Sequence, residues 1–297
     1  MFQLKTRHRQ WVLAYAFLLP TLLILAVFNF YPMIQAFVLS LFDYSLIGNR
    51  REFIGLGNFR RLVHDPQFWL ALRNSLLYLL VVPVIVVLSV ALALLVEPRI
   101  PFINFFRACY YVPVVTMMVV VAFAWKLIFN TDYGAINQVL RAMGVISEGI
   151  PWLTSGRMAL FTVMTVTIWK GLGYYMVMFI VGLKAVPREL IEAARIDGAG
   201  PAQVLLNVKL PALWPTVTLV SILSSISALQ VFEEIYVMTS GRLNTITLVY
   251  MMYESGLSLD AGALKMGYAC AVGVVLFVML FAFTFFSVRS MGKIYST

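Results

Sequence analysis

The feature that constrains this chain most is a series of long intervals that carry almost no charge. Five of the six intervals contain no Asp, Glu, Lys or Arg, and the fourth contains only Lys170. The intervals are 11–31, 76–96, 108–125, 158–183, 212–232 and 266–288. A helix of about 17 to 25 apolar residues crosses the hydrocarbon core of a bilayer, so each interval can span a membrane. The sequence therefore predicts an all-α membrane protein with six transmembrane helices.

Composition argues against a water-soluble globule or an enzyme. Hydrophobic residues make up 62% of the 297 positions and charged residues only 12%, well below the roughly 25% of soluble domains. The two cysteines, Cys109 and Cys270, each lie in an apolar interval, so no disulfide framework is predicted. There is no GxxxxGK[ST] or GxSxG motif, and His8 and His64 are far apart. We therefore predict a non-catalytic subunit without a catalytic residue, a metal site or a bound cofactor.

Charges outside the six intervals predict the orientation of the chain. If the N-terminus is cytoplasmic, Lys and Arg are denser in the inside segments, and most acidic residues fall in the outside segments. The positive-inside rule then places both termini in the cytoplasm. We predict a cytoplasmic tail at 1–10, a transmembrane domain at 11–288 and a second cytoplasmic tail at 289–297. The net charge of +9 is interpreted as membrane orientation, so no nucleic-acid partner is predicted.

The connector between the fourth and fifth intervals, 184–211, predicts a helix–turn–helix in the cytoplasm. Its first helix is expected over 188–197 and its second over 201–208, with a Gly-Ala-Gly turn between them and Leu210-Pro211 as a break. One interpretation is an ordinary connector in which Glu192 pairs with Arg188 or Arg195 at helical spacing. The alternative is a docking surface for another protein, because small residues at the turn allow a close approach.

The second interpretation is favoured by a family resemblance. Glu192-Ala193-Ala194, Gly198, Val208 and Leu210-Pro211 together resemble the EAA loop of the permease subunits of bacterial ABC importers. Further stretches, at 55–69, 105–115, 125–137, 168–187 and 228–241, look like the carbohydrate-uptake branch, similar to maltose-type and glycerol-phosphate-type permeases. The resemblance runs in order along most of the chain. Val208, where such loops more often have Ile, is one departure from the pattern.

The resemblance implies a type I ABC importer transmembrane domain in the bacterial inner membrane. The EAA loop would be a coupling helix in a cleft of the ATPase subunit, and Glu192 would offer its carboxylate to a basic residue there. Gly198 would supply the tight turn and Asp197 would cap or pair beside it. The expected coupling residues are Glu192, Ala193, Ala194, Asp197, Gly198, Leu210 and Pro211.

The resemblance also implies several partners. These are ABC ATPase subunits that carry ATP and Mg, a second permease subunit, an extracytoplasmic solute-binding protein and membrane lipid. A heterodimer of two different permease chains is expected, although a homodimer is left open. The implied function is a permease subunit that forms part of the path of a sugar or sugar derivative across the membrane. The alternative is a six-span secondary transporter or channel that is not coupled to ATP.

Residues of the fourth and fifth intervals are candidates for the substrate pathway, because a sugar path needs aromatic faces and hydrogen-bond partners in an apolar wall. The candidates are Trp169, Gly173, Tyr174, Tyr175, Ser224, Ser227 and Gln230. The alternative is a purely structural role, in which the serines donate hydrogen bonds to their own helix backbone and Lys170 forms a salt bridge with Glu233 or Glu234.

Two local features give further expectations. Residues 58–72 are expected to form short amphipathic helices at the outer interface, with Asp65-Pro66 as a helix start and Trp69 as an interface anchor. Tyr110, Tyr111 and Pro113 are expected to kink the third crossing or to anchor it at the interface.

Overall fold

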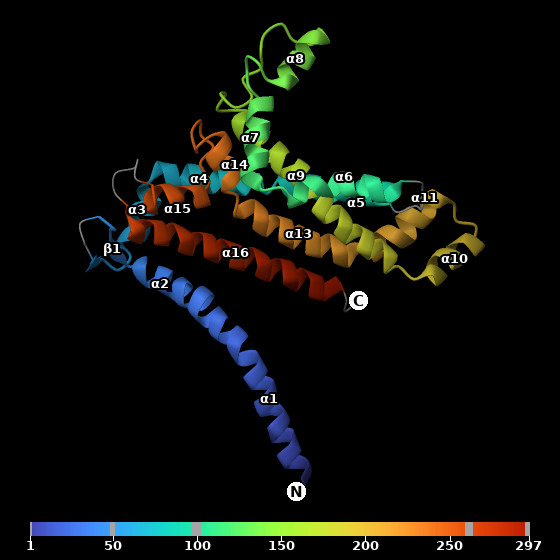
Figure 1. Ribbon diagram of the computed structural model, residues 1–297, viewed down its shortest axis with the longest axis horizontal. Coiled ribbons are helices and arrows are strands. Elements are labelled where there is room, and N and C mark those ends of the chain that lie inside the picture. The colour runs from blue at the N-terminus through green and yellow to red at the C-terminus, as the bar shows by residue number, and fades with distance from the viewer. Residues whose placement is uncertain (1, 48–50, 97–101, 259–263, 295–297) are drawn as a thin grey trace. The chain divides into compact units, whose positions relative to one another are not determined.

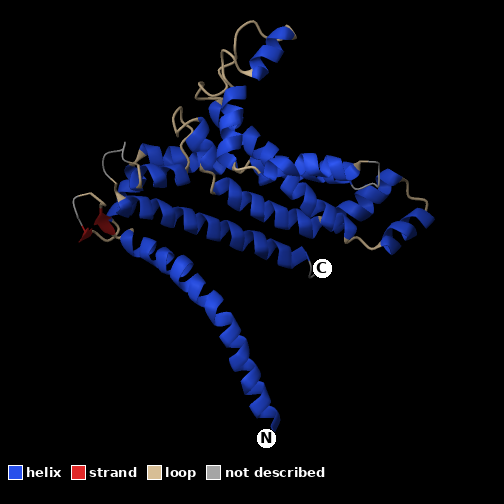
Figure 2. Ribbon diagram, in the orientation of Figure 1, coloured by secondary structure: helices blue, strands red, loops and turns tan. Residues whose placement is uncertain are grey.

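The computed structural model describes residues 2–47, 51–96, 102–258 and 264–294. It divides into two compact units, which are Met1–His64 with Met252–Val275 and Asp65–Met251 with Leu276–Thr297. Helices dominate both units, and the described strands are confined to one short hairpin (Figure 2). The all-α prediction is therefore confirmed apart from this hairpin.

The described residues contain four helices that are long and apolar enough to cross a membrane. They are Leu13–Leu39, Pro66–Val96, Ala159–Lys184 and Met266–Arg289. Two bent pairs add up to two more crossings, and they are Phe105–Val115 with Met118–Ile128 and Pro201–Ala212 with Trp214–Leu229. The prediction of six crossings agrees with this count when each bent pair is one crossing.

The third crossing differs from the single straight helix expected over 108–125. The helices α6 (Ile103–Val115) and α7 (Met118–Ile128) meet at an angle of 99°. Thr116 and Met117 between them have extended ψ angles of 138° and 134°, so the helical hydrogen-bond ladder stops there. A kink was expected here from Pro113, and the break lies three residues further along the chain.

The first unit contains a long helix that changes its winding. It comprises α1 (Phe2–Leu25), the π-helical turn η1 (Ala26–Phe30) and α2 (Tyr31–Leu39). Because α1 begins at Phe2, the residues 2–10 of the expected N-terminal tail are helical. The strands β1 (Phe42–Tyr44) and β2 (Arg51–Phe53) then pair antiparallel, with Phe42 opposite Phe53, and α3 (Gly57–His64) follows.

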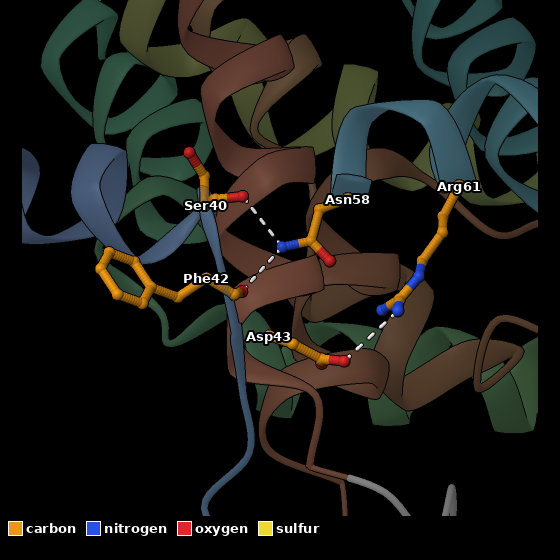
Figure 3. Close-up of polar contacts among 5 residues, drawn as sticks. All are labelled: Ser40, Phe42, Asp43, Asn58 and Arg61. Atoms are coloured by element: carbon orange, nitrogen blue, oxygen red, sulfur yellow. Dashed lines mark hydrogen bonds and ion pairs between the residues drawn. The ribbon is translucent and has the colours of Figure 1, made fainter. Parts of the chain in front are cut away.

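Asn58 of α3 fixes the hairpin in the first unit (Figure 3). Its side chain is 1% exposed, and its Nδ2 donates to the carbonyl oxygens of Ser40 at 2.9 Å and Phe42 at 2.8 Å. A Cβ atom at Gly267 of α16 (Met266–Ile294) would lie 2.1 Å from the Phe42 carbonyl oxygen, so only glycine allows this approach. Arg61 and Asp43 form an exposed ion pair of 3.3 Å beside this contact.

The second unit is arranged around α9 (Ala159–Lys184), which packs against α5 (Val81–Val96), α6 and α13 (Trp214–Leu229) (Figure 1). The close crossing of α6 depends on Gly173, because a Cβ atom there would lie 2.0 Å from the Tyr110 carbonyl oxygen. Val163, Met176 and Phe179 of α9 are fully buried in this bundle. The other elements are α4 (Pro66–Tyr78), α8 (Ala135–Ala142), α14 (Glu233–Met238), α15 (Leu248–Gly256) and α16 (Met266–Ile294).

The second crossing begins ten residues earlier than predicted. Asp65 caps α4 by accepting a hydrogen bond of 2.8 Å from the Gln67 backbone N–H, which confirms the predicted helix start. However, α4 continues with α5 as one crossing from Pro66 to Val96. The expectation of short helices over 58–72 is therefore correct for α3 and wrong for the part from Pro66 onward, where the apolar run of α5 extends the helix. The position of α3 at the outer interface stays a prediction.

Buried asparagines also fix two connections in the second unit. Asn137 is fully buried, and its Nδ2 donates to the carbonyls of Thr131 and Ile150 while its Oδ1 accepts from Trp152 Nε1 at 2.9 Å. Asn74 of α4 donates to the carbonyls of Asn244 and Ile246, at 2.6 and 2.8 Å. These contacts determine the path of the chain between α7 and α9 and between α14 and α15.

Candidate functional site

A cavity of about 700 Å³ lies in the second unit, where α9 and α13 meet α14 and the break between α6 and α7. Its size is within the range of small-molecule sites. Its lining includes nine polar or ionisable side chains, which are Thr167, Lys170, Tyr174, Tyr175, Ser224, Ser227, Gln230, Glu233 and Glu234. Apolar residues such as Val81, Ile85 and Phe232 complete the wall.

Five of the seven candidate pathway residues line this cavity, and they are Tyr174, Tyr175, Ser224, Ser227 and Gln230. The helical spacing places these side chains of α9 and α13 on the two facing sides of one space. Tyr174, Ser227 and Gln230 are exposed, whereas Tyr175 and Ser224 are buried in the wall. Ser224 Oγ donates to the Val220 carbonyl at 2.7 Å, which is the bond to its own helix backbone expected of a purely structural role.

The other two pathway candidates lie elsewhere. The Trp169 ring packs edge-on against Trp125 with 5.4 Å between ring centroids, and Trp169 is not among the residues that line the cavity. Gly173 is buried at the crossing of α6 and α9. We infer that Gly173 serves the packing of these helices, because the backbone of Tyr110 occupies the space that a side chain at this position would need.

Lys170 does not form the predicted salt bridge. No carboxylate oxygen of Glu233 or Glu234 lies within 4.0 Å of its Nζ, which instead donates to the Val114 carbonyl at 3.3 Å. Val114 is next to the end of α6, where the break deprives the last carbonyls of their helical partners. Lys170 therefore satisfies a backbone acceptor that could not be foreseen from the sequence, because the kink expected at Pro113 does not predict a complete break after Val115.

Four polar or ionisable residues of the cavity lining were missing from the predicted pathway, and they are Thr167, Lys170, Glu233 and Glu234. Thr167, Lys170 and Tyr174 are spaced i, i+3 and i+7, so they share one face of α9. This spacing was the signal in the sequence that could have placed Thr167 and Lys170 beside Tyr174. The described residues contain no group of three His, Cys, Asp or Glu side chains that could hold a metal ion.

The connector forms the predicted first helix, α10 (Arg188–Ile196), with Asp197 as its C-cap. None of its residues is buried, and Ile196 is 86% exposed. Gly198 follows with a φ of +83°, a left-handed conformation that favours glycine. Within the described part of the chain Glu192 makes no ion pair with Arg188 or Arg195, so the pairing expected of an ordinary connector is absent.

The second connector helix is longer than predicted. It runs through α11 (Pro201–Val204), the π-helical turn η2 (Leu205–Lys209) and α12 (Leu210–Ala212), and the 58° bend comes at Leu213. The expected break at Leu210-Pro211 is therefore wrong. In a regular helix the ring of Pro211 would clash with the carbonyl four residues before it, and the wider π-helical turn gives this carbonyl room. A π-helical turn also precedes Pro32, where η1 ends at Phe30.

The sequence profile of one protein family matches residues 68–291, which is most of the chain and includes the cavity and the connector. This family is described as the binding-protein-dependent transport system inner membrane component. The chain belongs to this family. It is therefore an inner-membrane permease component, and the alternative of a secondary transporter or channel is not supported.

Individual permeases agree with the family assignment over nearly the full chain. The protein named "Probable ABC transporter permease protein YurN", from Bacillus subtilis, is 32% identical over 94% of this chain and 95% of its own length. The lactose transport system permease protein LacF, from Rhizobium radiobacter, is 32% identical over 91% of this chain and 90% of its own.

A solved structure confirms the fold. It is described as a bacterial alginate ABC transporter in complex with an alginate pentasaccharide-bound periplasmic protein. One of its chains has a TM-score of 0.85 and 23% sequence identity, covering 99% of this chain and 98% of that chain. This likeness confirms the predicted fold of an ABC importer transmembrane domain.

Proposed function

We propose that this permease forms part of the path of a saccharide in an ATP-driven importer, and that the cavity between α9, α13 and α14 is on this path. The observation that carries the proposal is the lining of the cavity. Hydroxyl, amide and ionisable side chains converge there with aromatic rings in an otherwise apolar bundle. Saccharides are bound by this combination of hydrogen-bonding groups and flat apolar surfaces.

The substrate class is further supported by the related permeases. LacF is named for lactose, and a relative from Thermococcus litoralis that is 29% identical over 94% of both chains is named as a trehalose/maltose permease. We extend the carbohydrate class to this chain, because the matched region contains all of the residues that line the cavity.

Coupling to ATP is proposed to occur at the connector. The exposed α10 carries Glu192, Ala193 and Ala194, and Gly198 turns the chain back toward α11. A partner ATPase that binds ATP and Mg would hold this segment and move it when the nucleotide sites close. Leu210 and Pro211 lie at the other end of the segment, where α12 leads into α13. The movement would thus reach both helices that flank the cavity and alternate its access.

The proposed assembly has further members. A second, different permease chain would complete the path, and an extracytoplasmic solute-binding protein would deliver the saccharide. Both termini of this chain would lie in the cytoplasm, as the distribution of Lys and Arg favours. The connector is then on the cytoplasmic side, where the ATPase subunits bind.

Reconstitution of the assembled importer in proteoliposomes tests this function. We expect saccharide uptake that needs the solute-binding protein, internal ATP and the ATPase subunits together. We expect Glu192→Lys to abolish uptake while the complex still assembles, because the substituted charge opposes a basic residue of the partner. Uptake that continues without the ATPase subunits would overturn the proposal in favour of a secondary transporter or channel.

A further inference from the structure

Glu234 is the most firmly positioned ionisable group in the cavity. Its Oε1 accepts a hydrogen bond of 3.1 Å from Thr167 Oγ1, and Thr167 Oγ1 lies 2.6 Å from the hydroxyl of Tyr78. Because Thr167 has one hydroxyl proton and gives it to the carboxylate, Tyr78 must donate to Thr167. Tyr78 is fully buried, so this chain of hydrogen bonds anchors the carboxylate of α14 to α9 and to the protein core.

Lys170 lies on the same face of α9, one turn after Thr167, and lines the same cavity. Its Nζ uses one donor on the Val114 carbonyl, and an ammonium group has three. Lys170 and Glu234 line the same cavity, yet the two groups form no ion pair within 4.0 Å. The cavity therefore presents a cationic donor and an anionic acceptor that do not neutralise each other by direct contact.

The charges favour one class of saccharide. Glu233 also lines the cavity, so the described lining has two carboxylates against one ammonium group. A carboxylate accepts hydrogen bonds from sugar hydroxyls and an ammonium group donates to them, and hydrogen bonds to charged groups are about twice as strong as neutral ones. A uronate or sugar phosphate would add another negative charge beside these carboxylates, and like charges at close range repel each other.

We propose that Glu234 and Lys170 bind the hydroxyl groups of an uncharged saccharide, and that the carboxylates of the cavity select against acidic sugars. This inference rests on the proposed saccharide path. Thr167 and Tyr78 act as positioning residues that hold Glu234. The selectivity of this cavity is expected to differ from that of a transporter for an acidic polysaccharide such as alginate, even though the folds are alike.

Ligand binding to the assembled complex in nanodiscs, without the solute-binding protein, tests the inference. The probes are lactose and maltose, each paired with the uronic acid in which a C6 hydroxymethyl group is oxidised to a carboxylate, and dissociation constants are measured by saturation-transfer NMR. For the wild-type complex we expect at least one neutral disaccharide to bind, with its uronic acid about tenfold weaker or more. Equal or tighter binding of the uronic acids would overturn the inference, as would no binding by any probe.

Two variants assign the effect to these residues. Glu234→Gln and Lys170→Met should each weaken the neutral disaccharide by about tenfold, because each removes a charge-assisted hydrogen bond. Glu148→Gln, which changes a carboxylate outside the lining of the cavity, is the matched control and should bind like the wild type. Thr167→Ser should retain binding and Thr167→Val should weaken it. Unchanged affinity in Glu234→Gln would contradict the inference.

The test separates this inference from the proposed function. ATP hydrolysis stimulated by the solute-binding protein is measured on the same wild-type preparation. If hydrolysis is stimulated but the uronic acids bind as well as the neutral sugars, only the charge selectivity is wrong. If the solute-binding protein causes no stimulation, the proposed coupling fails independently of what the cavity binds.

Discussion

Single buried asparagine side chains fix the path of the backbone through hydrogen bonds that the sequence does not predict. The buried Asn58 of α3 donates hydrogen bonds to the carbonyl of Ser40, at the end of α2, and to the carbonyl of Phe42, in the hairpin. Replacing it with Ala would leave the carbonyls of Ser40 and Phe42 without this donor. An unsatisfied buried polar group costs about 1–3 kcal/mol.

We therefore expect Asn58→Ala to speed amide hydrogen exchange of the hairpin by about 30-fold, which corresponds to about 2 kcal/mol of local stability. Arg61→Ala is the control on the same helix. It removes an exposed ion pair, which typically contributes less than about 1 kcal/mol. Equal effects of the two substitutions would show that the hairpin does not depend on the asparagine.

Two glycines of α9 provide a matched test of helix packing. A Cβ atom at Gly173 would meet the Tyr110 carbonyl oxygen at 2.0 Å. A Cβ atom at Gly171 would meet side chains alone, the tip of Ile85 at 3.3 Å and the ring of Tyr175 at 3.4 Å. Gly173→Ala must push α6 away and should destabilise the protein by about 1–3 kcal/mol. Gly171→Ala should be neutral or slightly stabilising, since Ala favours a helix.

Thermal unfolding of the purified complex checks this prediction. The melting temperature should fall clearly for Gly173→Ala and stay within error for Gly171→Ala. If Gly173→Ala kept the wild-type melting temperature but lost saccharide binding, Gly173 would be a pathway residue, as the sequence analysis proposed, and not a packing residue.

At the residue scale, the sequence predicted which residues share a helical face but not which atoms they contact. Tyr174, Ser227 and Gln230 could be placed on one path because helical spacing determines which residues share a face. The partner of Lys170 could not be predicted, because it depends on a carbonyl that is free only where α6 breaks. Trp169 was chosen for its aromatic ring, but the packing of that ring against Trp125 depends on tertiary structure.

At the scale of elements, prolines change helices in a way that sequence rules describe incompletely. Pro211 was expected to end a helix, yet the helix continues through a π-helical turn and bends at Leu213 instead. The apolar intervals predicted that these helices exist. They did not predict the break at Thr116 and Met117, because neither residue is a helix breaker. The length of α4 was also missed, since Arg73 interrupts the apolar run while the helix continues through it.

The turn after α10 gives a test at this scale. Gly198 has a φ of +83°, and a Cβ atom there would meet no atom within 4 Å. In this chain, the backbone conformation therefore limits which residue can replace Gly198, and the space around it does not. Asn tolerates left-handed φ values, whereas a β-branched residue is strained there by about 1–3 kcal/mol.

We expect Gly198→Asn to retain at least half of the ATP hydrolysis that the solute-binding protein stimulates, and Gly198→Val to lose most of it. ATPase activity of the reconstituted complex, with and without the solute-binding protein, measures both. If both variants lost stimulation equally, contact with the ATPase and not backbone geometry would be what requires glycine.

At the scale of the molecule, one helix links the two candidate sites. The helix α9 runs without a break from Ala159 to Lys184, with cavity residues in its middle and the connector directly after its end. On the other side, α12 leads through the bend at Leu213 into α13, which also lines the cavity. A force on the connector can therefore reach both walls of the cavity, and this continuity supports the coupling that we propose.

The most direct measurement is a cross-link between the connector and the ATPase subunit. In the assembled importer, with Cys109 and Cys270 replaced by Ser, Glu192→Cys is treated with a short bis-maleimide. We predict a cross-linked product of this permease and the ATPase, which weakens or strengthens when ATP binds. Val145→Cys, which is also exposed but lies between α8 and α9, should give no such product. A connector cysteine that reacts with the reagent yet never joins the ATPase would contradict the account.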